Sequence, residues 1–184
     1  MRELALNVLD IAENSLAAGA KLIGISLSFN IAKDTMRIDI CDDGCGMDEE
    51  TVKKVTDPFT TSRTTRSVGM GLPLFKYSAE SAGGSFRISS RKGKGTTVSA
   101  EYRISHIDRM PLGDFGGVAL QLVTMNPGVD FCISVSDGER AGVLDTRDVK
   151  EILGEDIPLG APEVRAFLKD YIREILVSIY GGRL

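Results

Sequence analysis

An acid and an amide lie one helical turn apart near the start of the chain, in the stretch DIAENSLAAGA. Apolar residues recur at helical spacing through residues 2–18, and Gly19 is a typical C-terminal stop, so the sequence predicts a helix there. Asp10 and Asn14, at positions i and i+4, then project from one face. An amide oxygen can bind Mg²⁺ without adding negative charge, and a carboxylate one turn earlier can orient a water. A narrow polar stripe on a solvated helix face is the alternative interpretation.

The segment CDDGCGM, residues 41–47, places an acidic pair at the end of a predicted strand. A buried carboxylate can accept a hydrogen bond from the exocyclic amine of a base. Gly44 and Gly46 would let a planar ring approach the backbone closely. The alternatives are an ordinary strand-to-helix turn and an acidic Ca²⁺ loop, although the spaced acids of such a loop are missing.

A third segment, SVGMGLPLF, brings Gly69 and Gly71 to the start of a predicted helix. Unpaired amides and the helix dipole make such an N-terminus a candidate anion site. Arg63 and Arg66, in the polar loop 56–71, could reach phosphate oxygens, and a mobile lid would explain the length of that loop. A plain turn with solvated arginines is the alternative.

Composition and length indicate a globular protein. The chain has 184 residues, of which 42% are hydrophobic and 26% charged, enough for one domain or for a compact domain with a smaller appendage. No apolar run is long enough to span a membrane, and acids interrupt the N-terminal region, so we expect a cytoplasmic protein without a membrane partner. A net charge of −4 disfavours a broad nucleic-acid surface. Three cysteines predict neither a disulfide framework nor a metal cluster.

Hydrophobic periodicity divides the chain near residue 105. Residues 1–104 predict one mixed or antiparallel sheet with helices on one face, and residues 105–184 predict a separate small α/β unit. The expected strands are 21–30, 35–41, 85–91, 96–104, 129–136 and 140–144. The expected helices are 2–18, 48–55, 72–82, 117–125, 146–153 and 162–180.

The order of the motifs, rather than any one of them, suggests a family. DxxxN, DDGCGM, DPFTTSR, GMGL and GKGTTV follow one another within residues 1–104. This set resembles the GHKL ATPase superfamily, which includes histidine kinases, gyrase B, MutL-type repair proteins and the ninety-kilodalton heat-shock chaperones. ENSLAAGA resembles the MutL-type N box, whereas the later motifs resemble the histidine-kinase ATP-binding domain.

The resemblance implies an α/β two-layer sandwich, a mixed sheet with helices on one face, that binds ATP and Mg²⁺. Residues 105–184 would then be a small α/β unit that supplies a partner surface or a homodimer surface. Asp10 would be the catalytic base, with Asn14 on the metal and Asp42 on the adenine amine. The remaining nucleotide contacts would come from Gly44, Gly46, Arg63, Gly69, Gly71, Leu72 and Thr96.

The chain departs from the family pattern in two places. Asp10 stands where ATP-hydrolysing relatives have Glu, and losing one methylene withdraws the carboxylate by about an ångström, so we expect slow hydrolysis. Pro73 replaces the third glycine of the kinase motif, which the first turn of a helix tolerates.

The position of the single histidine bears on the function. A histidine kinase needs a phosphoacceptor histidine before its ATPase domain, yet the sequence starts at the N-box helix and His106 follows the domain. We therefore expect either a protein kinase, with serine as one target as in the anti-sigma-factor kinases, or a slow ATPase in signalling. The alternative is a non-catalytic switch in which ATP orders residues 56–71 and recruits a protein. The acidic composition and kinase-like motifs disfavour a MutL-like DNA function. The protein partner or substrate stays unidentified.

Overall fold

The computed structural model describes residues 3–56, 71–154 and 157–181. Within them lie six helices: α1 (Leu4–Ala17), α2 (Glu49–Val55), α3 (Gly71–Ser81), α4 (Phe115–Met125), α5 (Thr146–Leu153) and α6 (Pro162–Tyr180). The six strands are β1 (Leu22–Asn30), β2 (Thr35–Asp42), β3 (Ser85–Arg91), β4 (Gly95–Arg103), β5 (Asp130–Ser136) and β6 (Ala141–Asp145). None of these helices is long and apolar enough to cross a membrane.

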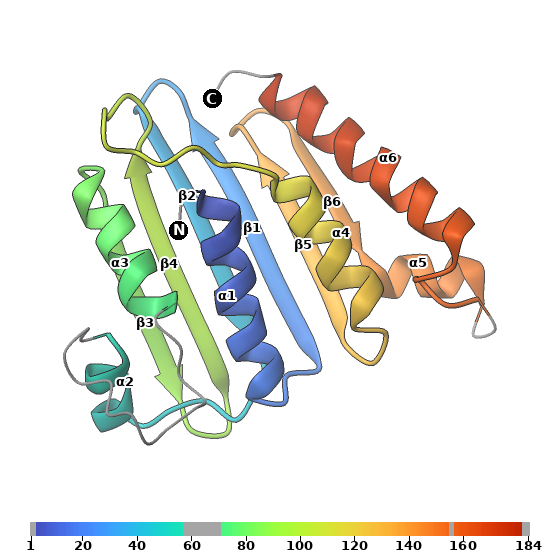
Figure 1. The fold of residues 1–184 in the computed structure, drawn as a ribbon, viewed down its shortest axis with the longest axis horizontal. Coiled ribbons are helices and arrows are strands. Elements are labelled where there is room, and N and C mark those ends of the chain that lie inside the picture. The colour runs from blue at the N-terminus through green and yellow to red at the C-terminus, as the bar shows by residue number, and fades with distance from the viewer. Residues whose placement is uncertain (1–2, 57–70, 155–156, 182–184) are drawn as a thin grey trace.

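One mixed sheet of six strands forms a layer of the molecule, in the order β3-β4-β2-β1-β5-β6. β1 and β5 run parallel, and the other neighbouring pairs are antiparallel. Helices α1, α3, α4 and α6 cover the same face of the sheet (Figure 1). The expected two-layer α/β sandwich with helices on one face is therefore confirmed.

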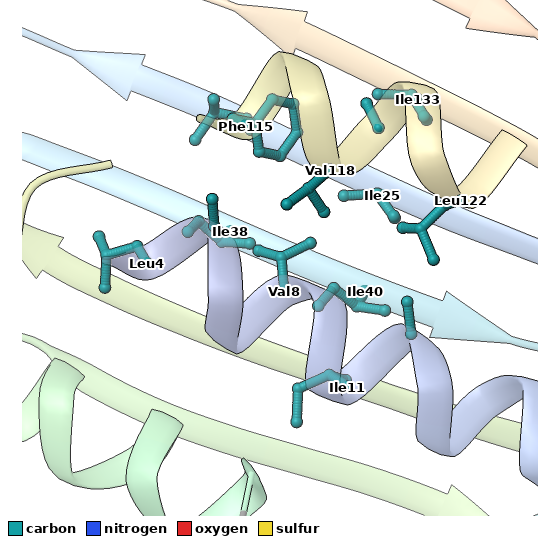
Figure 2. Close-up of a cluster of buried hydrophobic side chains, with 14 of the residues drawn as sticks. Leu4, Val8, Ile11, Ile25, Ile38, Ile40, Phe115, Val118, Leu122 and Ile133 are labelled. Carbon is teal, nitrogen blue, oxygen red and sulfur yellow. The ribbon is translucent and has the colours of Figure 1, made fainter. Parts of the chain in front are cut away.

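The core lies between the sheet and these helices. Every second residue of β1, from Ile23 to Phe29, is buried toward the helices, as the period of a strand requires. Figure 2 shows side chains of α1 and α4 meeting those of β1 and β2, among them Val8, Leu122, Ile25 and Ile38. Each such side chain, when fully buried, stabilises the fold by roughly 1.5–3 kcal/mol.

The predicted element boundaries hold to within about two residues. The starts of α1 and α4 differ most, by two residues each, and α4 begins at Phe115 rather than at residue 117 because Asp114 caps it. The Asp114 carboxylate accepts a hydrogen bond from the Gly117 amide, a partner that the first turn of a helix otherwise lacks. A glycine pair that reads as a break therefore lies inside the helix.

The C-terminal elements extend the first sheet and do not form a sheet of their own. β5 pairs with β1 along its whole length, from Leu22↔Asp130 to Ser28↔Ser136. The first amides of α1 also donate to the carbonyls of Pro111 and Leu112. The picture of a separate C-terminal α/β unit is corrected in this respect, because alternation fixes which face a strand buries but not which strand it pairs with.

Candidate functional site

A cavity of about 280 Å³ opens where α1, the end of β2 and the start of α3 meet. Most of its exposed wall is apolar, and a few polar side chains reach into it, as in typical small-molecule sites. Its lining consists of Ile11, Asn14, Ser15, Ala17, Ala18, Asp42, Cys45, Gly46, Met47, Thr51, Leu72, Thr96 and Val98.

Asp42 is the acceptor on the sheet side of this cavity. As the last residue of β2, its carboxylate is held in place by two donors. The Ser15 hydroxyl donates to Oδ2 at 2.8 Å, and the Gly44 amide donates to Oδ1 at 2.9 Å. Each carboxylate oxygen can accept a further hydrogen bond, so the group can also receive an amine from a ligand in the cavity.

Thr96 lies beside Asp42 because strand register places it there. Asp42 pairs with Thr96 across β2 and β4, and Thr96 pairs with Ser90 across β4 and β3. The hydroxyls of Thr96 and Ser90 are 2.9 Å apart, and Ser90 also accepts the Met47 amide at 2.8 Å. A row of hydrogen-bonding groups across three strands thus ends at the cavity.

Packing of the chain itself accounts for both glycines of the DDGCGM segment. A Cβ on Gly44 would lie 2.9 Å from that of Ala18 and 3.0 Å from Asp42 Oδ1. Gly46 has a φ of +62°, and a Cβ there would lie 2.1 Å from the Arg91 carbonyl oxygen. Gly46 lines the cavity, whereas Gly44 supports Asp42 through its amide.

The polar pair on α1 divides between the cavity and its edge. Asn14 lines the cavity. Asp10, one turn earlier, lies against the first residue of α3, where a Cβ on Gly71 would be 3.0 Å from that of Asp10 and 3.4 Å from its Oδ2. Partial burial raises the pKa of the Asp10 carboxyl above its ordinary value.

The structure thus brings several of the expected site residues to one place. Asn14, Asp42, Gly46, Leu72 and Thr96 line the cavity. Asp10, Gly44 and Gly71 contact or adjoin this group. Arg63 and Gly69 lie outside the described residues.

Sequence reasoning missed Ser15, Cys45 and Ser90. Counting the register outward from the Lys92–Lys94 turn pairs Ser90 with Thr96, so that signal was present in the sequence. Ser15 reaches Asp42 across 27 residues, a contact that the crossing of α1 over β2 decides. Cys45 stands between Gly44 and Gly46, so its place in the cavity lining could have been inferred from those two glycines.

His106 lies away from this cavity. It packs against Gly83, just beyond the C-terminal end of α3, and its Nδ1 accepts the amide of Asp108 at 3.2 Å. The cavity adjoins the other end of α3, and a helix of 11 residues is about 16 Å long. His106 is therefore no part of the candidate site.

Comparison with known proteins identifies the domain that holds the cavity. The family described as histidine kinase-, DNA gyrase B- and HSP90-like ATPases matches residues 1–106. The chain belongs to this family. All the lining residues of the cavity lie within the matched range, and membership in a family of ATPases supports ATP as its ligand.

Curated relatives share the N-terminal part of the chain. A putative sensor protein of Shewanella frigidimarina is 29% identical over 109 residues, which are 59% of this chain and 16% of the relative. The signal transduction histidine-protein kinase AtoS of Escherichia coli is 29% identical over 99 residues, 54% of this chain and 16% of AtoS. This chain thus matches about a sixth of the length of either relative. It carries an ATPase domain of the kind found in histidine-kinase sensor proteins.

A solved structure shares the fold over a larger part of the chain. The N-terminal domain of a DNA repair protein superposes with a TM-score of 0.55 at 13% identity, covering 84% of this chain and 58% of that one. The match extends well beyond residues 1–106, so part of the C-terminal elements also superposes on that fold.

Proposed function

We propose that this protein binds ATP with Mg²⁺ and acts as a protein kinase, with serine as one target, or as a slow ATPase in signalling. The cavity is the observation that supports this proposal. Five residues expected from the motifs line it within the matched domain. They come from α1, β2, the turn after β2, α3 and β4. These residues are far apart in the sequence, and the fold brings their side chains together in one pocket.

Asp42 is the proposed adenine-recognising group. Its two internal hydrogen bonds fix the carboxylate, and carboxylate oxygens accept hydrogen bonds, which suits the exocyclic amine of adenine. Apolar neighbours such as Ile11, Leu72 and Val98 offer flat contact for a base. We assign Gly69, Gly71 and Arg63 to the phosphates by their place in the motifs.

Asn14 is the proposed metal ligand. The described residues contain no group of three or more His, Cys, Asp or Glu side chains that could hold a metal. Mg²⁺ commonly binds through one or two protein oxygens together with nucleotide phosphates and water, so one amide oxygen in the cavity fits that mode. When bound, Mg²⁺ would neutralise charge on the phosphates.

Asp10 is the proposed general base. Its carboxylate lies against Gly71, the residue before Leu72 of the cavity lining, and burial makes it a stronger base than an exposed aspartate. We expect phosphate release in the wild type, with its rate falling as the pH is lowered through the raised pKa of Asp10. Asp10→Ala should abolish release while calorimetry still detects ATP binding. A wild type that binds ATP without releasing phosphate would exclude the ATPase.

Transfer to a protein is tested separately. The chain is incubated with [γ-³²P]ATP and its co-purified proteins, and labelled proteins are separated and hydrolysed to identify the phosphorylated residue. Label on serine supports the kinase, and free phosphate without labelled protein supports the ATPase. Asp10→Ala is the control for contaminating kinases.

A nucleotide-dependent switch is the second candidate. It is favoured by Asp10, which is one methylene shorter than Glu and packs against Gly71 rather than lining the cavity. A pull-down with and without a non-hydrolysable ATP analogue tests it, with Asp42→Asn as the matched control. A partner that is retained only with the analogue, together with no ATP turnover, supports the switch. A partner that is retained equally with and without the analogue contradicts it.

A further inference from the structure

Asn7 is a fully buried amide without a partner. Its side chain is 0% exposed, and among the residues that the structure describes neither Nδ2 nor Oδ1 has a hydrogen-bond partner. Burying an unpaired amide opposes folding, and Leu4, Val8 and Ile11 show that apolar side chains fill the neighbouring buried positions of α1. An amide at this place needs an explanation.

Asn7 lies on the same side of α1 as the two polar residues of the site. At about 100° per residue it is rotated by roughly 60° from Asp10 and lies one turn before it, while Asn14 is rotated by roughly 40° and lies one turn after it. Asp10 contacts the start of α3 at Gly71, so this is the side of α1 that packs on α3. Asn7 is fully buried and Asp10 is partly exposed, which places the amide deeper.

The spacing of the two side chains suits one intervening water. Residues at i and i+3 of a helix have Cβ atoms about 5–6 Å apart. No direct hydrogen bond joins Asn7 to Asp10. A water can make a hydrogen bond of about 2.8 Å to each of two polar side chains one helical turn apart, and an amide can both donate to and accept from that water.

We propose that Asn7 is a positioning residue for Asp10, its amide holding one water that donates to the Asp10 carboxylate. The functional part of this inference rests on the proposed role of Asp10 as a base. The water would fix one carboxylate oxygen and favour the ionised form, leaving the other oxygen free for the reacting water. Burial acts on Asp10 in the opposite direction.

The charged group that acts on the Asp10 carboxyl is the N-terminal ammonium of the chain, which lowers its pKa against the larger effect of burial. On α3 Asp10 lies against the uncharged Gly71, and Asn14 on α1 is neutral. Glu3, two turns earlier, packs against Gly113 instead. No ion pair within the described residues includes Asp10.

Asn7→Leu in the full chain is the decisive variant. It removes the amide together with its water-mediated link to Asp10 and fills the place with an apolar side chain of similar size, so the chain should still fold. We also expect the proton affinity of Asp10 to increase by about tenfold, because its hydrogen-bond donor is lost. Carbon NMR of protein with labelled aspartate carboxyl groups follows the titration, and Asp10→Asn assigns the signal.

Two further variants separate hydrogen bonding from packing. Asn7→Ser keeps a hydroxyl and leaves space for water, so Asp10 should titrate as in the wild type. Val8→Ala, a buried change on the sheet side of α1, should lower the Tm without moving that titration.

The titration does not depend on ATP turnover. If the wild type releases no phosphate, the proposed base role of Asp10 fails, yet the link between Asn7 and Asp10 is still measured. The inference is overturned if Asp10 titrates identically in wild type and Asn7→Leu, or if Asn7→Ser shifts it as much as Asn7→Leu does.

Discussion

Asp42 accepts hydrogen bonds from Ser15 and Gly44, and Asn at this position can keep the Gly44 bond through its amide oxygen. Asp42→Asn should therefore fold, while the oxygen facing a ligand amine becomes an NH₂ group. We expect ATP affinity to fall about 10–100-fold, because a hydrogen bond to a charged group is lost and two donors then face each other. The affinity for inosine triphosphate, which lacks that amine, should fall little. Calorimetry with both nucleotides measures the difference, and equal losses would remove Asp42 from adenine recognition.

Cys45 offers a chemical test of the same cavity. Its side chain lines the cavity, whereas Cys41 lies in a hollow on the opposite, open face of the sheet, and both are exposed. ATP should slow iodoacetamide labelling of Cys45 by about tenfold or more at saturating concentration, by blocking access, and leave Cys41 unchanged. Peptide mass spectrometry reads both thiols in one sample, so Cys41 is the internal control. Undiminished labelling of Cys45 would mean that ATP binds elsewhere.

Some residues of the site could be predicted from sequence because their spacing follows one element. Asn14 and Asp10 share a helix face by simple counting, and Asp42 follows from its place at a strand end. Ser15 and Asn7 could not be predicted in the same way. Whether a polar residue on an apolar helix is paired with a distant carboxylate, or left unpaired, depends on what packs against it.

At the scale of elements, the turn after β2 packs its backbone against the β3–β4 hairpin. Gly46 lies where a Cβ would meet the Arg91 carbonyl oxygen at 2.1 Å, and its φ is +62°. Gly46→Ala should cost about 3 kcal/mol or more, from left-handed strain together with the clash. Gly93, at the tip of the hairpin, has a φ of +74° but no atom within 4 Å of an added Cβ, so Gly93→Ala should cost about 1–2 kcal/mol.

Urea unfolding followed by circular dichroism compares the two variants. A larger loss of unfolding free energy for Gly46→Ala than for Gly93→Ala, together with weaker ATP binding, would show that hairpin packing shapes the cavity. Equal losses would show that left-handed strain alone accounts for the cost.

The elements themselves were largely predictable, because their signals are local. Asp48 caps α2 as expected, with its carboxylate accepting the Thr51 amide. Pro162 opens α6 and Gly181 follows its end in the left-handed conformation. The start of α4 was placed too late, since a glycine pair reads as a break unless the cap before it is recognised.

At the scale of the whole molecule, the order of the strands in the sheet could not be predicted from the sequence pattern. β1 has a hairpin partner on one side, and nothing in its alternation shows which strand takes the other side. That place belongs to β5, more than a hundred residues later in the chain. The expected boundary near residue 105 therefore falls at a connection inside one continuous sheet.

Continuity of the sheet predicts that residues 1–184 unfold as one cooperative unit. A fragment of residues 1–106 would lose β5 and expose the free edge of β1, and the first amides of α1 would lose the carbonyls of Pro111 and Leu112. We expect this fragment to unfold at a lower urea concentration than the full chain and to self-associate, because exposed edges pair with other edges. Size exclusion at increasing concentration measures the association.

A charge on the exposed edge distinguishes edge pairing from general loss of stability. Ser26 lies on the open face of β1, at a position that pairs with β5 in the full chain, so Ser26→Lys in the fragment should reduce its self-association without restoring its stability. A monomeric fragment that unfolds at the same urea concentration as the full chain would contradict this account. Residues 1–106 would then be an independent domain, and the parallel pairing of β5 with β1 would add nothing to its stability.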